Sequence, residues 1–128
     1  MAGTIVADTI QDGAGNSTSM DNAIYGSAKA WVNYNASTQT IRASYNISSV
    51  TYNTTGDITL NFTTAFSDAN YTIVGSSQAI AATANPWIMI NGFNGPTLQA
   101  PTTTACRVFC QQTGTGYNSA YICISIFR

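Results

Sequence analysis

Five aspartates are the side chains of this sequence best suited to acid–base chemistry, because histidine and glutamate are both missing. A glycoside hydrolase would need two such carboxylates on facing walls of a cleft. Asp57 instead follows the glycine of a predicted turn and Asp68 begins a corner, and aspartates in turns commonly accept hydrogen bonds from backbone N–H groups. The other three occur within the first 21 residues. We therefore expect structural roles for Asp57 and Asp68 and no catalytic residues.

Metal and cofactor chemistry also lack a recognisable motif. The three cysteines match no zinc-binding spacing, and no histidine is present to complete a site. The Gly-rich stretch "DGAGN" at 12–16 is not followed by the lysine and helix that a phosphate-binding loop requires. We expect no metal site and no cofactor.

The cysteines pose a separate question of pairing. Cys106 and Cys110 would lie about 13 Å apart on one strand, too far for a disulfide. Cys110 and Cys123 would fall near opposite positions if a hairpin formed through "QTGTGYNSA". There they would touch, and would bridge in an oxidising setting. The odd number of cysteines favours reduced, buried thiols.

Exposed aromatic residues are the remaining candidates for ligand contacts, namely Trp31, Tyr34, Trp87, Phe93 and Tyr117. Trp87 follows a proline, Phe93 lies in "NGFNGP", and Tyr117 with Asn118 lies in the Gly-rich stretch "TGTGYNSA". Rings flanked by glycine and asparagine suit contact with a sugar or a protein surface. The alternative is that these rings fold back over the edge of the domain.

Short alternating segments must position these residues. Polar and apolar residues alternate as in β-strands, Gly, Asn, Pro and Ser separate the segments, and sustained helical periodicity is absent. Only "SSQAIAATA" could form a helical turn or two. The pattern predicts an all-β protein, an antiparallel, jelly-roll-like β-sandwich of about eight strands. The strands are expected at 29–35, 40–46, 47–53, 57–64, 70–77, 86–93, 106–113 and 120–128. Alternation predicts that Val50 and Tyr52 lie across from the face shared by Ile58, Leu60 and Phe62. It also predicts that Ile122, Ile124 and Ile126 share one face of the last strand.

Two features point to contacts outside the domain. Residues 1–24 form an arm separate from the domain at 25–128. After a short strand-like stretch, residues 11–22 are rich in Gly, Ser, Asn and Asp, which predicts a loop or linker. This arm is either disordered, laid along a neighbouring subunit or docked to a partner. The last strand is apolar on both faces, which suits either a second subunit or an ordinary central position in a sheet.

Composition restricts the partners. Charged residues make up 7% of the chain and the net charge is −1, which favours association of copies. Four scattered basic residues argue against nucleic acid, and no apolar run approaches the ~20 residues that span a bilayer. The first 15 residues lack the basic and apolar regions of a secretory signal, so we expect folding in a cytosol.

A family resemblance adds to this interpretation. The stretch from Ala28 to Ile73, with "AWVN", "IRASYN", "TGDITLNFTTAF" and "DANY", resembles a domain of bacteriophage virion proteins, especially tail-fibre-like proteins of marine and cyanobacterial phages. "MAGTIVADTI" and "ICISIFR" are similar to the ends of short members. The resemblance is strong over 28–73 and weak over 78–119, and the matched positions are structural, so no site residue is carried over.

The resemblance implies a non-enzymatic component on the exterior of a virion that is assembled in the host cytoplasm. A homotrimeric β-sandwich spike or fibre tip is the leading expectation, with the arm bound to other virion proteins and the loops 78–86, 91–104 and 113–119 facing a host glycan or protein. The first alternative is a head decoration protein bound to the capsid. The second is a carbohydrate-binding module.

Overall fold

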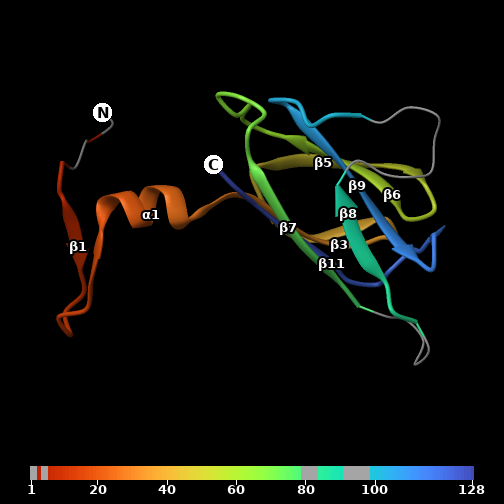
Figure 1. The fold of residues 1–128 in the computed structure, drawn as a ribbon, viewed down its shortest axis with the longest axis horizontal. Coiled ribbons are helices and arrows are strands. Elements are labelled where there is room, and N and C mark those ends of the chain that lie inside the picture. Colours follow the sequence, from red (N-terminus) through yellow and green to blue (C-terminus); the bar gives the residue numbers. More distant parts are fainter. Residues whose placement is uncertain (1–2, 4–5, 79–83, 91–98) are drawn as a thin grey trace.

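Two antiparallel β-sheets face each other in the computed structural model, which describes residues 3, 6–78, 84–90 and 99–128 (Figure 1). One sheet has four strands in the order β4, β3, β11 and β7; the larger one has the order β5, β6 and β9, with β8 and β10 also pairing with β9. This confirms the predicted all-β, sandwich-like fold. The strands are β3 (Ala28–Asn35), β4 (Thr40–Tyr45), β5 (Ile47–Thr54), β6 (Asp57–Phe62), β7 (Thr72–Ser77), β8 (Trp87–Ile90), β9 (Ala105–Gln112), β10 (Thr115–Gly116) and β11 (Ile122–Phe127).

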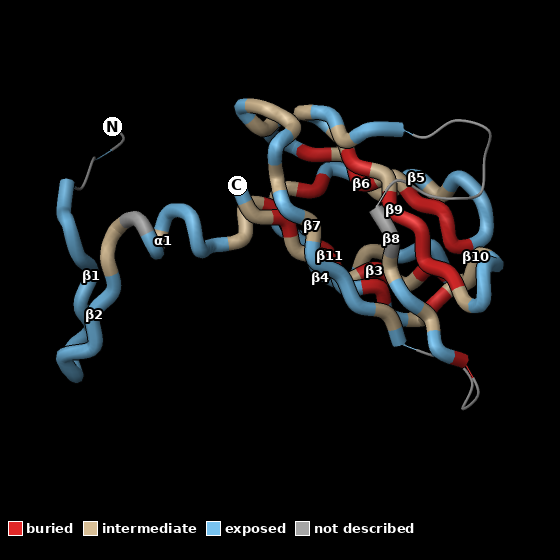
Figure 2. The backbone as a smooth tube through the Cα atoms, in the orientation of Figure 1, coloured by how far each residue is buried: buried red, intermediate tan, exposed pale blue. Residues whose placement is uncertain are grey.

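The core lies between the sheets, and Figure 2 shows the buried stretches of the chain gathered in the sandwich. The register of the first hairpin of the larger sheet is the predicted one, with Val50 opposite Leu60 and Tyr52 opposite Ile58. On β11 the predicted inward set is fully or almost fully buried. The buried core comprises Ala30, Val32, Tyr34, Ala36, Ile47, Ile58, Leu60, Phe62, Cys106, Val108, Cys110, Ile122, Ile124 and Ile126.

Asn46 carries the chain from one sheet to the other. It is the single residue between β4 and β5 and adopts a positive φ of 54°, which asparagine tolerates better than most residues. Its side-chain oxygen accepts a hydrogen bond from the backbone N of Thr64 (2.7 Å), and its amide donates to the carbonyl of Lys29 (3.2 Å). One side chain thus joins the ends of both sheets.

The N-terminal arm is more regular than its composition predicts. Residues 11–22 were expected to form a loop, but the structure has a hairpin of β1 (Thr9–Gln11) and β2 (Ser17–Ser19) and then helix α1 (Met20–Gly26). Asp12 accepts hydrogen bonds from the backbone N of Ala14 and of Asn16 (both 2.9 Å) and shapes the turn. Ser19 caps the helix by accepting from the N of Asn22.

The arm stands away from the sandwich (Figures 1 and 2). It leads into β3 through Ser27, and the Lys29 ammonium donates to the carbonyl of Ile24 at the end of α1. A helical turn was predicted within "SSQAIAATA", but the first two residues of this stretch belong to strand β7. Residues 79–83 of the same stretch lie outside the described part of the chain.

Candidate functional site

The aromatic residues predicted to contact a ligand differ in exposure, and Tyr34 is wrong as a candidate because its side chain is buried in the core. Trp87 begins β8 and is 45% exposed, whereas Tyr117 is partly buried against the core. Asn118 follows it at the same end of the sandwich. Phe93 lies outside the described residues, so its prediction stays open. Of the described candidates, Trp87 presents the more exposed aromatic ring.

Asn118 holds two segments of the fold together. Its side-chain oxygen accepts from the backbone N of Gly56 (2.9 Å), and its amide donates to the Tyr52 hydroxyl (3.1 Å). Its backbone carbonyl accepts from the Ser37 hydroxyl (2.9 Å). The polar groups of this side chain are therefore used to fix the β5–β6 turn, a role that sequence alone did not indicate.

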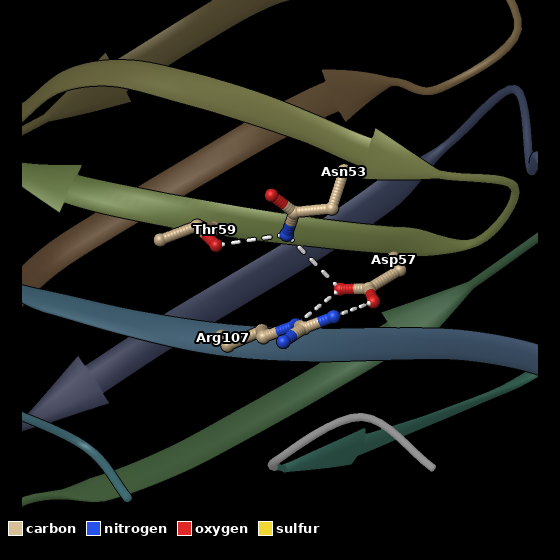
Figure 3. A network of polar contacts seen from close by, with 4 residues as sticks. All are labelled: Asn53, Asp57, Thr59 and Arg107. Atoms are coloured by element: carbon tan, nitrogen blue, oxygen red, sulfur yellow. Dashed lines mark hydrogen bonds and ion pairs between the residues drawn. The ribbon is translucent and has the colours of Figure 1, made fainter. Parts of the chain in front are cut away.

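A buried ion pair explains the role of Asp57 (Figure 3). Asp57 is fully buried and accepts hydrogen bonds from the Arg107 guanidinium and from the Asn53 amide (3.1 Å), which also donates to Thr59 (2.9 Å). Burial by itself would raise the pKa of Asp57, but these hydrogen bonds and the charge of Arg107 outweigh it and lower the pKa. Asp57 is thus structural as expected, through an ion pair rather than a turn cap.

Asp68 takes the predicted turn role. Its carboxylate accepts a hydrogen bond from the backbone N of Asn70 (2.7 Å) and pairs with the Arg128 guanidinium. The hydrogen bond from Arg128, followed by that from Asn70, lowers the pKa of Asp68. Each described carboxylate of the sandwich therefore has an arginine partner, an arrangement that stabilises the charged form and suits structure better than proton transfer.

The predicted approach of Cys110 to Cys123 is wrong. Cys110 is buried on β9 of the larger sheet, whereas Cys123 is exposed on β11 of the four-stranded sheet. The expected hairpin does not reach Cys123, because β10 pairs with β9 over two residues only and residues 117–121 then carry the chain to the other sheet. All three thiols are free, and only Cys106 and Cys110 fit the expectation of burial.

The outer face of the four-stranded sheet, meaning its solvent side, exposes three large apolar side chains, those of Trp31, Tyr45 and Val74. Its residues form a continuous row across all four strands, because Tyr45 pairs with Trp31, Trp31 with Ser125, and Ser125 with Val74. Tyr45 is 58%, Val74 56% and Trp31 38% exposed. A second row next to it contains Ala43, Asn33, Cys123 and Ser76.

Two cations border this outer face. Arg42 lies over the ring of Tyr121, with 4.0 Å between its guanidinium carbon and the ring centroid, and it also donates to the carbonyl of Ala120. Lys29 precedes Trp31 by two residues and so shares its side of β3. A hollow of about 360 Å³ lies at the Tyr45 end of the outer row and is lined by Tyr45, Asn46, Thr63 and Thr64.

Over β5 and β6, the outer face of the larger sheet is polar, and its side chains hydrogen-bond to one another. The Asn61 amide donates to the hydroxyls of Ser49 and Thr51 (both 3.0 Å), and the network of Asn53 continues it. Side chains of one strand thus bind those of the next. The outer face over β5 and β6 is thus an amide–hydroxyl network. Trp87 on β8 of the same sheet and the row on the four-stranded sheet expose apolar groups.

The described residues contain no group of three or more metal-ligating side chains. Within the same residues, no helix has the length and apolar character needed to cross a bilayer. In comparisons with known proteins, no family model, curated protein or solved structure matches the chain.

Proposed function

We propose that this protein is a non-enzymatic structural component of a phage virion, a homotrimeric β-sandwich that forms a spike or fibre tip on the particle exterior. The proposal combines the resemblance of residues 28–73 to phage virion domains with one structural observation. That observation is the outer row Tyr45–Trp31–Ser125–Val74, a surface that favours burial against another protein.

Low charge supports assembly into a larger particle. Only 7% of the residues are charged, so copies of the protein repel one another weakly. Their exposed apolar rows can therefore come into contact. A closed ring of copies would cover one such face on each subunit. The polar face of the larger sheet would remain in contact with water.

The arm and the loops around Trp87 have different roles in this proposal. Residues 1–24 form a projecting arm that attaches the sandwich to neighbouring subunits of the particle, either other virion proteins or further copies of this chain. Contact with a host glycan or protein falls to the loops around Trp87, whose indole is exposed. Asn118 instead fixes the β5–β6 turn through its hydrogen bonds with Gly56 and Tyr52. The alternative is a head decoration protein, which would form the same homotrimer but bind the capsid.

Light scattering tests the trimer. We expect the purified chain at micromolar concentration to have three times the 13.5 kDa mass of one copy. The double variant Trp31→Thr, Tyr45→Thr removes two aromatic groups from the outer row and should shift the mass towards one chain, because each buried aromatic side chain contributes about 1.5–3 kcal/mol. Thr51→Ser on the polar face is the matched control and should remain trimeric. A monomeric unmodified protein would reject the homotrimer.

A further inference from the structure

The N-terminal arm exposes apolar side chains that have no cover in the single chain. On α1, Ile24 is 49% and Tyr25 66% exposed, and Ile10 of β1 is also exposed. Helix α1 has seven residues, and isolated helices of this length are unstable in water without a surface to pack on. The exposed apolar side chains of the arm therefore favour packing on an apolar surface.

The charges of the arm and of the sandwich are opposite. Residues 1–28 contain three aspartates and no lysine or arginine, whereas residues 29–128 contain all four basic residues and two aspartates. Those two aspartates pair with Arg107 and Arg128. Among the described residues this leaves Lys29 and Arg42 without a carboxylate partner, and both border the outer face of the four-stranded sheet.

The outer face thus fits the arm in both respects. It offers the row of Tyr45, Trp31 and Val74 to apolar side chains, and two cations at its border to the aspartates of the arm. Oppositely charged surfaces favour encounter and fix the orientation of docking. The arm of the same chain is directed away from this sheet (Figure 1), which makes the arm of another copy the fitting occupant.

We propose that the arm of each copy packs on the outer face of the four-stranded sheet of the next copy. The contact joins two different surfaces, and such head-to-tail contacts close into a ring when the rotation between copies permits. With three copies, every arm and every outer face has a partner. This inference rests on the proposed self-assembly and names the surfaces that produce it.

Cys123 reports on this contact because it lies in the second row of the outer face and is exposed in the single chain. Cys106 and Cys110 do not interfere, since both are buried and burial raises the pKa of each thiol, that of Cys106 to about 12. In the assembled protein, a thiol reagent should label Cys123 about tenfold more slowly than in a variant whose arm cannot dock, as is usual for a group held in a protein contact.

The experiment compares thiol labelling rates in full-length chains. Ile24→Ser with Tyr25→Ser weakens docking of the arm and should make Cys123 reactive. The matched control carries Cys123→Ser with Thr51→Cys, which places the accessible thiol on the polar face of the larger sheet. That control should be labelled rapidly whether or not the arm is intact.

Complementation between chains then decides whose arm covers the thiol. The arm variant, which keeps Cys123, is refolded with an excess of chains that have an intact arm and Cys123→Ser. We expect the intact arms to restore slow labelling of Cys123 in the variant chains. If Cys123 of the variant chains were still labelled rapidly in this mixture, a chain's own arm would be the one that protects it. That result would overturn the proposal that arms pack on the next copy. A trimer in which Cys123 is labelled rapidly would overturn it while leaving the proposed trimer in place, and a monomer would reject the assembly itself.

Discussion

Gly56→Ala is expected to abolish stable folding, with a loss of more than about 4 kcal/mol in the free energy of unfolding. A Cβ atom at this position would lie 2.1 Å from the carbonyl oxygen of Cys110 and 2.5 Å from the backbone N of Tyr117. Both are backbone atoms, which cannot move aside as a flexible side chain can. The Cys110 segment is also held to Gly56, because the Gly56 carbonyl accepts a hydrogen bond from the N of Cys110 (2.7 Å). Relief of the clash would separate the β5–β6 turn from β9.

Gly114→Ala is the matched control. Gly114 has a φ of +81°, close to the +76° of Gly56, but a Cβ atom there would meet nothing within 4 Å. This variant carries the conformational penalty of about 1–2 kcal/mol without the clash. Urea unfolding at one fixed protein concentration measures both. Equal losses for the two variants would show that backbone conformation, and not the close approach of segments, makes Gly56 necessary.

Arg107→Met should destabilise the fold by about 3 kcal/mol, because it leaves the fully buried Asp57 carboxylate without its charge partner. The double variant Asp57→Asn, Arg107→Met removes both charges and should recover most of this loss. Urea unfolding at pH 7 gives the comparison. If the double variant were as unstable as Arg107→Met alone, packing of the arginine stem, and not the unpaired charge, would be responsible.

Acid unfolding provides the pH dependence of the same pair. In the folded protein the pKa of Asp57 is lowered, so the pair contributes stability above the unfolded pKa of an aspartate, about 3.9. That contribution is lost as the pH falls through the lower, folded pKa. We therefore expect the stability difference between the unmodified protein and the double variant to shrink as the pH drops below about 4. A constant difference would contradict an ionised Asp57.

The strands could be predicted from sequence because their pattern is local. Alternation placed all eight main strands, and Val50 and Tyr52 were correctly set opposite β6. Helix α1 and the β1–β2 hairpin were missed because seven-residue and three-residue elements are too short for periodicity to be seen. There the hydrogen bonds of Asp12 and Ser19 outweigh a composition typical of loops.

The apolar row on the four-stranded sheet could not be predicted from the sequence, because its prediction requires knowing which strands are neighbours. Trp31, Tyr45 and Val74 belong to three strands that become neighbours only through the order β4, β3, β11 and β7. The prediction that β11 is apolar on both faces was the one signal of this surface. The position of Cys123 was predicted wrongly for the same reason. The strands β9 and β11 follow each other as long strands in the sequence, but they belong to different sheets.

Immunogold labelling of purified phage particles tests the central claim most directly. Antibodies against the folded sandwich, applied to intact particles of a phage that encodes the chain, should bind the particle exterior. Gold at the tail would support the spike or fibre tip, and gold spread over the head would support the decoration alternative. Particles that carry no gold and, after dissociation, contain no copy of the chain would contradict a structural role in the virion.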